Sequence, residues 1–440
     1  MRYTKEGWRF LTWLRARLHQ LQAQTSGHTP DNSGVRLVFV QFGDYSEAFH
    51  RLREPAGAET YYAQRYTIDF VAELAAGGSV EAVTVVTFSR DEELTELLPR
   101  LSTAGVKLYV EGQPARHAEL IRLVEQQRPT HLIISAPIVP LMRWGLASGI
   151  PVLPLFADSF RGDGLRQQVR NARLAYVLND PRIRYVANHN LAAALELERI
   201  GVEPSKILPY DWPAVVSPHE FPAKQAPASD RPFRLIYVGQ VSEAKGVGDL
   251  IHALVELNRV GKACTLTIVG QTLDPSLSAL SEQLGVADQV RFLGTRAHDE
   301  VSEAMREHDA VVVPSRHEYP EGLPMTLYEG LCSRTPLIVS DHPMFALRIR
   351  AYENALVFAA GSPSALAASV LELASDAALY QRLSENAESA ADGYLCPLKW
   401  DRLITSWLDP VHGDDIQQHR LDEALAELPL DHDGNPSAQV

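Results

Sequence analysis

Apolar strands alternate with amphipathic helices twice along this chain, and this alternation constrains its fold more than any other feature. In the first half we predict helices at residues 66–76, 92–98 and 115–127, and strands at 35–40, 82–88, 107–110, 131–135 and 151–155. A helix that follows each strand returns the chain to the same end of the sheet, so the strands are expected to pair in parallel. The first half is therefore predicted to form a doubly wound α/β sheet.

The second half repeats the pattern. Helices are predicted at 247–258 and 301–308, and strands at 234–238, 265–269, 290–293, 310–313, 337–339 and 355–358. The stretch 208–232 holds many prolines and is interpreted as the connection between the two halves. We therefore predict an α/β fold of two doubly wound, Rossmann-like domains, at 34–215 and 233–394, joined by a linker at 216–232. They should face each other across a cleft, where ligands commonly bind.

The two ends of the chain carry weaker signals. Residues 1–33 form an extension in which apolar side chains recur at helical spacing over 5–24, beside several arginines. This segment can dock on protein, either the body of the chain or a second copy, or lie on a membrane surface; we favour protein. The acidic tail at 411–440 is expected to be a short helix followed by disorder.

Composition excludes several classes of protein. A net charge of −14 argues against nucleic acid as the main partner. Cys264, Cys332 and Cys396 are far apart, with no CxxC pair, so a zinc site is not expected and the thiols are interpreted as core residues. No signal peptide and no apolar run of about 18 residues is visible, so we expect a cytoplasmic protein without a membrane-spanning helix.

The segment Glu321-Gly-Leu-Pro-Met-Thr-Leu-Tyr-Glu329 carries the strongest functional signal. Pro324 lies where a helix should begin, and proline is favoured at the first helical position. A loop carboxylate, the free N–H groups of a helix start and a helix carboxylate then share one pocket. Carboxylates bind sugar hydroxyls and a helix N-terminus binds phosphate, so the segment suits a nucleotide sugar. The alternative is a pair of solvated carboxylates; the apolar neighbours of Glu329 and the buried-type strand before Glu321 argue against it.

A second loop follows the strand predicted at 234–238. It runs Gly239-Gln240-Val-Ser-Glu-Ala-Lys245-Gly246, so a glycine at the strand end allows close backbone approach and a lysine precedes the next helix. Lys245 can reach a diphosphate from this position. The spacing fits neither a Walker A loop nor GxGxxG, and a plain turn with a solvated lysine remains the alternative.

Taken together, these motifs resemble the retaining GT-B glycosyltransferases, specifically the large family 4 (group 1) of nucleotide-sugar transferases. The resemblance runs over residues 234–345. It rests on the lysine loop, Val290-Arg-Phe-Leu-Gly294, Val313-Pro-Ser315, the Glu321–Glu329 segment and Arg334-Thr-Pro-Leu-Ile-Val-Ser-Asp341. Ordered matches at plausible spacing are far more specific than either motif alone.

The resemblance implies roles for individual residues. Lys245 would bind the donor diphosphate, Glu321 the donor sugar hydroxyls and Glu329 the ribose hydroxyls. Other donor contacts would come from the loop residues Gly322 and Leu323, from the N–H groups of Met325 and Thr326, and from Gly239, Gln240, Thr295, Arg296, Ser315 and Arg316. The family often has arginine where this chain has Gln240, and Arg316 is the candidate for the missing charge.

The resemblance also implies that a helix near 395–410 returns to the first domain. The N-terminal half matches the family less well. Gly57 resembles the glycine loop that approaches the donor phosphate. Asp158 stands where many relatives carry a histidine that faces the reaction centre. A carboxylate there could position the acceptor hydroxyl or stabilise positive charge on the sugar ring; the alternative is a helix N-cap at Asp158 or Ser159.

The resemblance implies a retaining hexosyl- or related glycosyltransferase that needs no metal and no cofactor besides its nucleotide-sugar donor. Asp158, Lys245 and Glu321 are its candidate catalytic residues, and the leaving phosphate would accept the proton of the acceptor hydroxyl. The acceptor would be a glycan, a lipid-linked molecule or a protein. Two alternatives remain open at this point: a sugar-nucleotide epimerase or hydrolase on the same fold, and an inactive partner subunit of a glycosylation complex.

Overall fold

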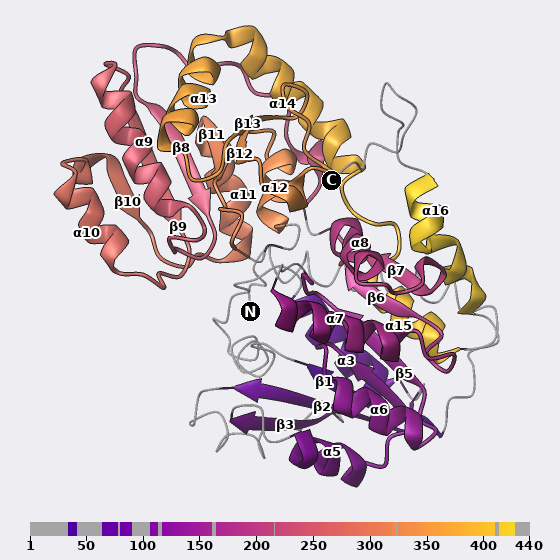
Figure 1. The fold of residues 1–440 in the computed structure, drawn as a ribbon. Coiled ribbons are helices and arrows are strands. Elements are labelled where there is room, and N and C mark those ends of the chain that lie inside the picture. The colour runs from indigo at the N-terminus through magenta and orange to yellow at the C-terminus, as the bar shows by residue number, and fades with distance from the viewer. Residues whose placement is uncertain are drawn as a thin grey trace, which may run out of the picture.

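The computed structural model describes residues 34–41, 64–77, 80–89, 106–112, 117–160, 164–214, 216–319, 321, 324–409 and 413–426. Two α/β domains lie one above the other in Figure 1, and the chain returns to the first domain near its C-terminus. The predicted helices at 5–24 and 92–98 and most of the acidic tail lie outside the described residues. No helix in the described part of the chain is long and apolar enough to cross a bilayer.

The first domain contains a seven-stranded sheet in the order β3-β2-β1-β4-β5-β6-β7. Its strands are β1 (Arg36–Gln41), β2 (Ala82–Ser89), β3 (Val106–Gly112), β4 (His131–Ile134), β5 (Val152–Phe156), β6 (Val186–His189) and β7 (Ile207–Tyr210). All pairs are parallel, and β1 is an inner strand, with Val38 opposite Thr84 on one side and Leu132 on the other. The predicted doubly wound sheet is confirmed.

Alternate residues of β1 point into two different cores, as a strand covered on both faces requires. Val38 and Val40 belong to the core beneath α5 (His117–Gln126), α6 (Val139–Ala147), α7 (Leu165–Leu178) and α8 (Leu191–Arg199). Leu37 and Phe39 belong to the opposite core, which is closed by α3 (Gln64–Ala76) and α15 (Trp400–Leu408). The Phe39 and Trp400 rings stack with centroids 6.3 Å apart, so α15 is part of the first domain although it follows the second in sequence.

Residues 207–210 correct the sequence interpretation at one point. They lie within the stretch that its prolines marked as the connection between halves, yet they form β7 and pair with β6 along their whole length. Pro209 is tolerated because β7 is an edge strand, where one side of the backbone needs no ladder partner. The other residues of β7, Ile207, Leu208 and Tyr210, are apolar and buried, as a strand of the core requires.

The second domain contains a six-stranded parallel sheet in the order β10-β9-β8-β11-β12-β13. The strands are β8 (Phe233–Val238), β9 (Cys264–Val269), β10 (Val290–Phe292), β11 (Ala310–Val313), β12 (Leu337–Ser340) and β13 (Ala355–Phe358). The helices are α9 (Val247–Arg259), α10 (Ser276–Gln283), α11 (His298–Glu307), α12 (Met325–Cys332), α13 (Pro363–Ser375) and α14 (Ala377–Asp392). Helices α9 and α13 pack on one face of the sheet, and α11 and α12 on the other.

The strand order of each sheet reverses at one point, between β1 and β4 in the first and between β8 and β11 in the second. Open α/β sheets bind ligands outside the carboxyl ends of their strands at such a point. The loop with Lys245 follows β8, and the loop that ends in Glu321 follows β11. The topology therefore brings the two strongest sequence motifs of this chain to one place.

The two domains share an apolar cluster that runs from the first sheet to α12. Tyr328 of α12 donates a hydrogen bond to the carbonyl of Val216 in the linker at 3.0 Å. Helix α16 (Leu421–Ala426), near the end of the described chain, contacts α8 and β7 of the first domain. The relative position of the domains is thus fixed by packing around the linker and by the returning chain.

Candidate functional site

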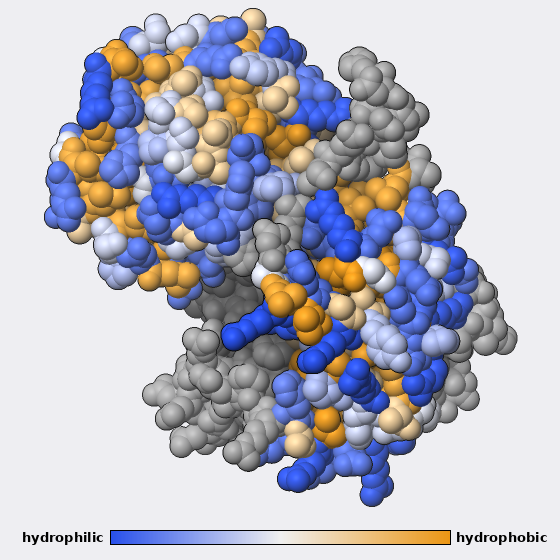
Figure 2. Space-filling view, viewed as in Figure 1, coloured by the Kyte–Doolittle hydropathy of each residue, from blue (hydrophilic) through white to orange (hydrophobic). Residues whose placement is uncertain are grey.

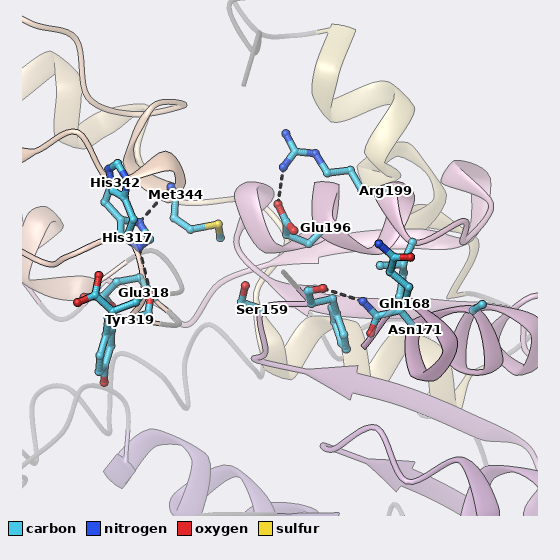
Figure 3. Close-up of a pocket in the computed structure, with 14 residues that line it drawn as sticks. Ser159, Gln168, Asn171, Glu196, Arg199, His317, Glu318, Tyr319, His342 and Met344 are labelled. Atoms are coloured by element: carbon cyan, nitrogen blue, oxygen red, sulfur yellow. Dashed lines mark hydrogen bonds and ion pairs between the residues drawn. The ribbon is translucent and has the colours of Figure 1, made fainter. Parts of the chain in front are cut away.

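A cavity of about 760 Å³ lies between the two domains and is lined by fourteen residues. The N-terminal wall, as we call it, consists of Ser159, Phe160, Gln168, Asn171, Ala172, Glu196, Arg199 and Ile200. The C-terminal wall consists of His317, Glu318, Tyr319, Glu321, His342 and Met344. Figure 3 shows the two sets facing each other from different domains. The volume falls within the range of sites that bind small molecules.

Two loops at the reversal point of the second sheet hold the C-terminal wall in place. Gly246 has φ +75°, and a Cβ there would lie 2.1 Å from the carbonyl oxygen of Pro314. Only glycine permits both this left-handed conformation and this approach of one backbone to another. The N–H of Arg316 also donates to the carbonyl of Ala244 at 3.0 Å. The turn after β8 is therefore packed directly on the loop after β11.

That packing brings Lys245, Ser315 and Glu321 into one cluster. The Nζ of Lys245 lies 2.5 Å from Oε1 of Glu321, and the hydroxyl of Ser315 donates to the same oxygen at 2.5 Å. The side chains of Lys245 and Glu321 are 14% and 5% exposed, so the ion pair is largely shielded from water. Buried charges persist only when they are paired and hydrogen-bonded, as here. The solvated-lysine alternative is therefore wrong for Lys245.

Tyrosine side chains surround this cluster. Lys245 Nζ lies 4.3 Å from the centroid of the Tyr319 ring, and the Tyr319 hydroxyl donates to Oε1 of Gln240 at 3.2 Å. The hydroxyl of Tyr237 donates to the backbone carbonyl of Gln240 at 2.6 Å. Burial, and then the nearby charge of Glu321, raise the pKa of both tyrosines, so both remain hydrogen-bond donors at neutral pH.

Arg316 lies beside the cluster but is held by other partners. Its guanidinium donates to both carboxylate oxygens of Asp249, at 2.9 and 2.7 Å, and to Glu243 at 2.6 Å. The hydrogen bond to Asp249 and the nearby carboxylate charges raise the pKa of Arg316 further above its usual range. Two carboxylates already balance this cation, so the geometry does not favour the predicted role of Arg316 in replacing the charge that Gln240 lacks.

Helix α12 carries the second glutamate. Pro324 is its N-cap residue and Met325 its first helical residue, one position later than the sequence suggested. Glu329 is 5% exposed, so the prediction that it is not a solvated surface carboxylate is confirmed. Thr326 Oγ1 donates to the carbonyl of Val238 at 3.3 Å, which ties the helix start to the end of β8. Gly322 and Leu323 lie outside the described residues.

Two histidines of the C-terminal wall were not predicted. His342 accepts a hydrogen bond from the Met344 N–H at its Nδ1 (3.2 Å), so its Nε2 donates to the carbonyl of Tyr319 at 3.1 Å. His317 Nε2 lies 2.8 Å from Oδ1 of Asp341. Both rings follow strand ends, as ligand-binding residues do in such sheets. Extending the glutamate motif backwards through His317-Glu318-Tyr319 would have identified half of this wall.

On the opposite side, Asp158 lies in the loop after β5. Its backbone N–H donates to Oδ1 of Asn188 at 3.2 Å, and its carbonyl accepts from Nδ2 of the same residue at 3.0 Å. Burial raises the pKa of the Asp158 carboxyl. The helix-cap alternative fails, because α7 begins at Leu165 with Gly164 as its N-cap. Asn188 thus fixes the backbone of Asp158, which directly precedes Ser159 of the N-terminal wall.

The N-terminal wall itself is formed by α7, α8 and the loop after β5. Asn171 donates from Nδ2 to the carbonyl of Phe160 at 2.8 Å and so connects α7 to that loop. Arg199 donates to the buried carboxylate of Glu196 at 2.7 Å, one helical turn away on α8 (Figure 3). These residues were missed because α7, α8 and β6 were themselves not predicted.

The remaining predicted residues lie away from the cavity wall. Gly239 directly follows β8 with φ +150°, and its carbonyl oxygen would lie 1.8 Å from a Cβ on Gly270, so the two loops pack closely. Thr295 and Arg296 are exposed in the loop after β10. Gly57 lies outside the described residues. Among the predicted site residues that the structure describes, Glu321 is the one that lines the cavity.

The cysteines fit their predicted place in the cores. All three are buried and unpaired, and burial raises the pKa of Cys264 to about 11 and that of Cys332 to about 12. Within the described ranges, no group of three or more His, Cys, Asp or Glu residues is arranged to hold a metal ion.

Comparison with known proteins agrees with the geometry of the C-terminal wall. Residues 219–390 match the family model of the glycosyl transferases group 1. This part of the chain is similar to the proteins of that family. The group 1 segment runs from the linker into α14 and contains Lys245, Ser315, Glu321 and Glu329.

Curated relatives match parts of the chain. The alpha-D-kanosaminyltransferase of Streptomyces kanamyceticus is 31% identical over 159 residues, which are 36% of this chain and 40% of the relative. A glycogen synthase of Mycobacterium tuberculosis is 30% identical over 203 residues, or 45% of this chain and 48% of the relative. The chain thus spans less than half the length of these two relatives. A D-inositol 3-phosphate glycosyltransferase of Salinispora arenicola is 26% identical over 71% of this chain and 72% of the relative.

Solved structures share the two-domain fold. Anabaena Alr3699/HepE, in complex with UDP, has a TM-score of 0.59 at 16% identity, covering 82% of this chain and 95% of that one. The lipopolysaccharide-biosynthesis glycosyltransferase WaaG has a TM-score of 0.55 at 18% identity over 86% of this chain and 99% of its own. The predicted GT-B arrangement of two Rossmann-like domains is confirmed.

Proposed function

We propose that this chain is a glycosyltransferase that moves a sugar from a nucleotide-sugar donor to an acceptor hydroxyl. The observation that carries the proposal is the buried cluster of Lys245, Ser315 and Glu321 at the reversal point of the second sheet, of which Glu321 lines the interdomain cavity. A cation beside a carboxylate suits a ligand that joins a phosphate to a sugar. The group 1 family match and the UDP and UDP-glucose complexes of HepE support this choice of ligand.

Donor binding would separate the ion pair between Lys245 and Glu321. The ammonium of Lys245 is shared between Glu321 and the face of Tyr319, so an incoming diphosphate would take it from the carboxylate. Glu321 would then accept hydrogen bonds from sugar hydroxyls, and Glu329, on α12, from the ribose. The N–H groups of Met325 and Thr326 lie at the start of α12, where the helix dipole favours negative charge.

Catalysis in this proposal is positioning combined with electrostatic stabilisation. Lys245 and the start of α12 would stabilise the negative charge that develops on the leaving diphosphate. That diphosphate would accept the proton of the acceptor hydroxyl on the same face of the sugar, which gives retention and needs no protein base and no metal. Asp158 would stabilise positive charge on the sugar ring from the opposite wall, and the amides of that wall would bind the acceptor.

The decisive experiment is a donor panel measured by calorimetry with UDP-, GDP-, ADP- and dTDP-sugars. We expect saturable binding of at least one donor, weakened by Glu329→Ala and unchanged by Glu256→Ala, a solvent-facing control on α9. The absence of binding across the panel, or unchanged affinity in Glu329→Ala, would overturn the donor site. Full release of nucleotide without an acceptor would replace the transferase with a hydrolase.

The stereochemistry and the metal independence of the proposed reaction are tested separately. Nuclear magnetic resonance of the product should show the anomeric configuration of the donor, and an inverted product contradicts the same-face mechanism. Turnover should survive chelation of divalent ions; a loss that added Mg²⁺ or Mn²⁺ restores would contradict metal independence.

A further inference from the structure

Helix α7 exposes large apolar side chains to solvent. Leu165 and Tyr176 are 76% and 77% exposed and Val169 is 43% exposed. Six large hydrophobic side chains are exposed in the described part of the chain, and these are three of them. Their spacing of four and seven residues places all three on one side of the helix, together with Ala172. Isolated exposed apolar residues are ordinary, but a stripe of them on one helix indicates a contact surface.

Arginines form a second stripe on the same helix. Arg166, Arg170 and Arg173 are exposed, stand one position after Leu165, Val169 and Ala172, and therefore lie beside the apolar stripe. Helix α7 contains no acidic residue, whereas the whole chain has a net charge of −14. Figure 2 shows this juxtaposition over α7, where strongly hydrophobic and strongly hydrophilic side chains protrude together. The helix is thus a local basic and apolar surface on an acidic protein.

The exposed face of α7 adjoins the residues of the same helix that line the cavity. At about 100° per residue, Gln168, Asn171 and Ala172 occupy one edge of the helix, the apolar stripe comes next and the arginines follow. Gln168, Asn171 and Ala172 line the interdomain cavity. Whatever covers the exposed face of α7 therefore lies next to the part of the helix that lines the cavity.

We propose that the exposed face of α7 docks the protein on an anionic lipid surface. Apolar side chains that enter the head-group region, flanked by arginines that meet lipid phosphates, are the composition of helices that lie in a membrane interface. A second copy of the chain is a less suitable partner, because a twofold-symmetric contact through α7 would place the arginines of the two copies against each other. Three side chains also supply little of the roughly 1,200 Å² that stable protein interfaces bury.

Docking on lipid also bears on the acceptor of the proposed function. Only this inference about the acceptor rests on the proposed transferase activity. With α7 against a lipid surface, the N-terminal wall borders the head groups, so an acceptor that carries a lipid would reach the cavity without leaving the membrane. A lipid-linked acceptor is therefore the class that the surface favours. The docking itself does not depend on transferase activity.

Vesicle co-sedimentation of the full chain tests the proposal. We expect binding to vesicles of phosphatidylcholine with phosphatidylglycerol, much weaker binding to phosphatidylcholine alone, and a decrease with added salt. Each arginine contributes about a fivefold gain in affinity, so the variant Arg166→Gln/Arg170→Gln/Arg173→Gln should lose roughly a hundredfold. The variant Leu165→Ser/Val169→Ser/Tyr176→Ser should also lose most binding.

Matched controls lie elsewhere on the molecule. Val260, Leu273 and Tyr352 are 63%, 54% and 52% exposed, so their replacement by serine removes similar exposed apolar surface from the second domain. Arg122→Gln/Arg291→Gln/Arg382→Gln removes the same charge from other exposed positions. Both controls should bind vesicles like the wild type. Equal losses in controls and α7 variants would overturn the proposal.

Three other outcomes would also overturn it. They are no wild-type binding to anionic vesicles, loss of binding in Trp8→Ser/Trp13→Ser while the α7 variants still bind, and a concentration-dependent dimer that the α7 variants abolish. Calorimetry of the α7 variants with soluble donor separates this proposal from the proposed function. Normal donor binding with lost vesicle binding supports both, whereas vesicle binding without donor binding leaves docking standing and removes the transferase.

Discussion

The two walls of the cavity are constructed in different ways. The C-terminal wall comes from loops at a sheet reversal, where backbone packs on backbone at Gly246 and a buried ion pair joins Lys245 to Glu321. Most of the N-terminal wall comes from the sides of α7 and α8, whose polar groups project from regular helices, and the rest from the loop after β5. A wall of interlocked loops tolerates few substitutions, whereas side chains on a helix can change one at a time. The C-terminal wall is therefore suited to binding a group that stays the same, and the N-terminal wall to binding a ligand that can vary.

The largest expected effect is that of Lys245→Met. Removal of the cation should lower kcat/KM about 10² to 10³-fold, as loss of one preorganised charge-stabilising group does in other enzymes. It should also lower the free energy of unfolding by about 3 kcal/mol, because Glu321 remains buried without its partner. Steady-state kinetics and chemical denaturation measure the two effects.

The double variant Lys245→Met/Glu321→Gln makes this comparison sharper. It should recover most of the lost stability, because no buried charge is left, but none of the lost activity. Lys262→Met, in the same domain, is the control and should leave turnover unchanged. If the double variant regains activity, the cluster is structural and the contrast between the walls disappears.

The next largest effect concerns the packed loops. Gly246 and Gly261 both have φ +75°, but a Cβ at Gly261 meets nothing within 4 Å. Gly261→Ala should therefore cost about 1 kcal/mol of unfolding free energy, the strain of the left-handed conformation. Gly246→Ala should cost at least about 2 kcal/mol more, because its methyl group would overlap the Pro314 carbonyl. Equal costs, measured by urea denaturation, would show that the loops are not interlocked.

A smaller effect is expected on the N-terminal wall. Gln168 is exposed on α7 and lines the cavity, so Gln168→Ala should raise the KM for the acceptor about two- to tenfold through one lost hydrogen bond. Donor affinity and the free energy of unfolding should not change. Initial-rate kinetics with each substrate varied in turn measures this. A change in donor affinity would mean that the two walls do not act separately.

The smallest effect is a pH dependence at Asp158. Burial raises the pKa of this carboxyl in the folded state, so the folded protein holds the proton more tightly than the unfolded chain does. Stability is then lost as the pH rises from the ordinary carboxyl pKa through the raised value. The free energy of unfolding of Asp158→Asn should exceed that of the wild type by an amount that grows over this window and then stays constant. Denaturation at a series of pH values measures it, and a constant difference would refute the prediction.

Sequence patterns found the second domain more completely than the first. The strands β8 and β11 and the helix α9 are continuous or periodic apolar runs, which need no tertiary information. Helix α7 was missed because Leu165, Val169 and Tyr176 place apolar residues on its solvent face and so hide its amphipathic period. Strand β6 was missed because Asn188 and His189 are polar yet buried. The exposed apolar face that we propose to dock on lipid is thus also the reason that the sequence pattern did not predict this helix.

The sequence by itself determined the fold class, the lysine loop and the glutamate pair, because local periodicity and spacing are written in consecutive residues. Only the tertiary structure decided which side chains meet. It paired Lys245 with Glu321, gave Arg316 to Asp249 and Glu243, and added His317 and His342 to the wall. It also stacked the Trp400 ring of α15 on the Phe39 ring of β1, a contact between residues far apart in the chain. The physical reason is that charge compensation and close packing depend on distances between segments far apart in sequence, which no local pattern specifies.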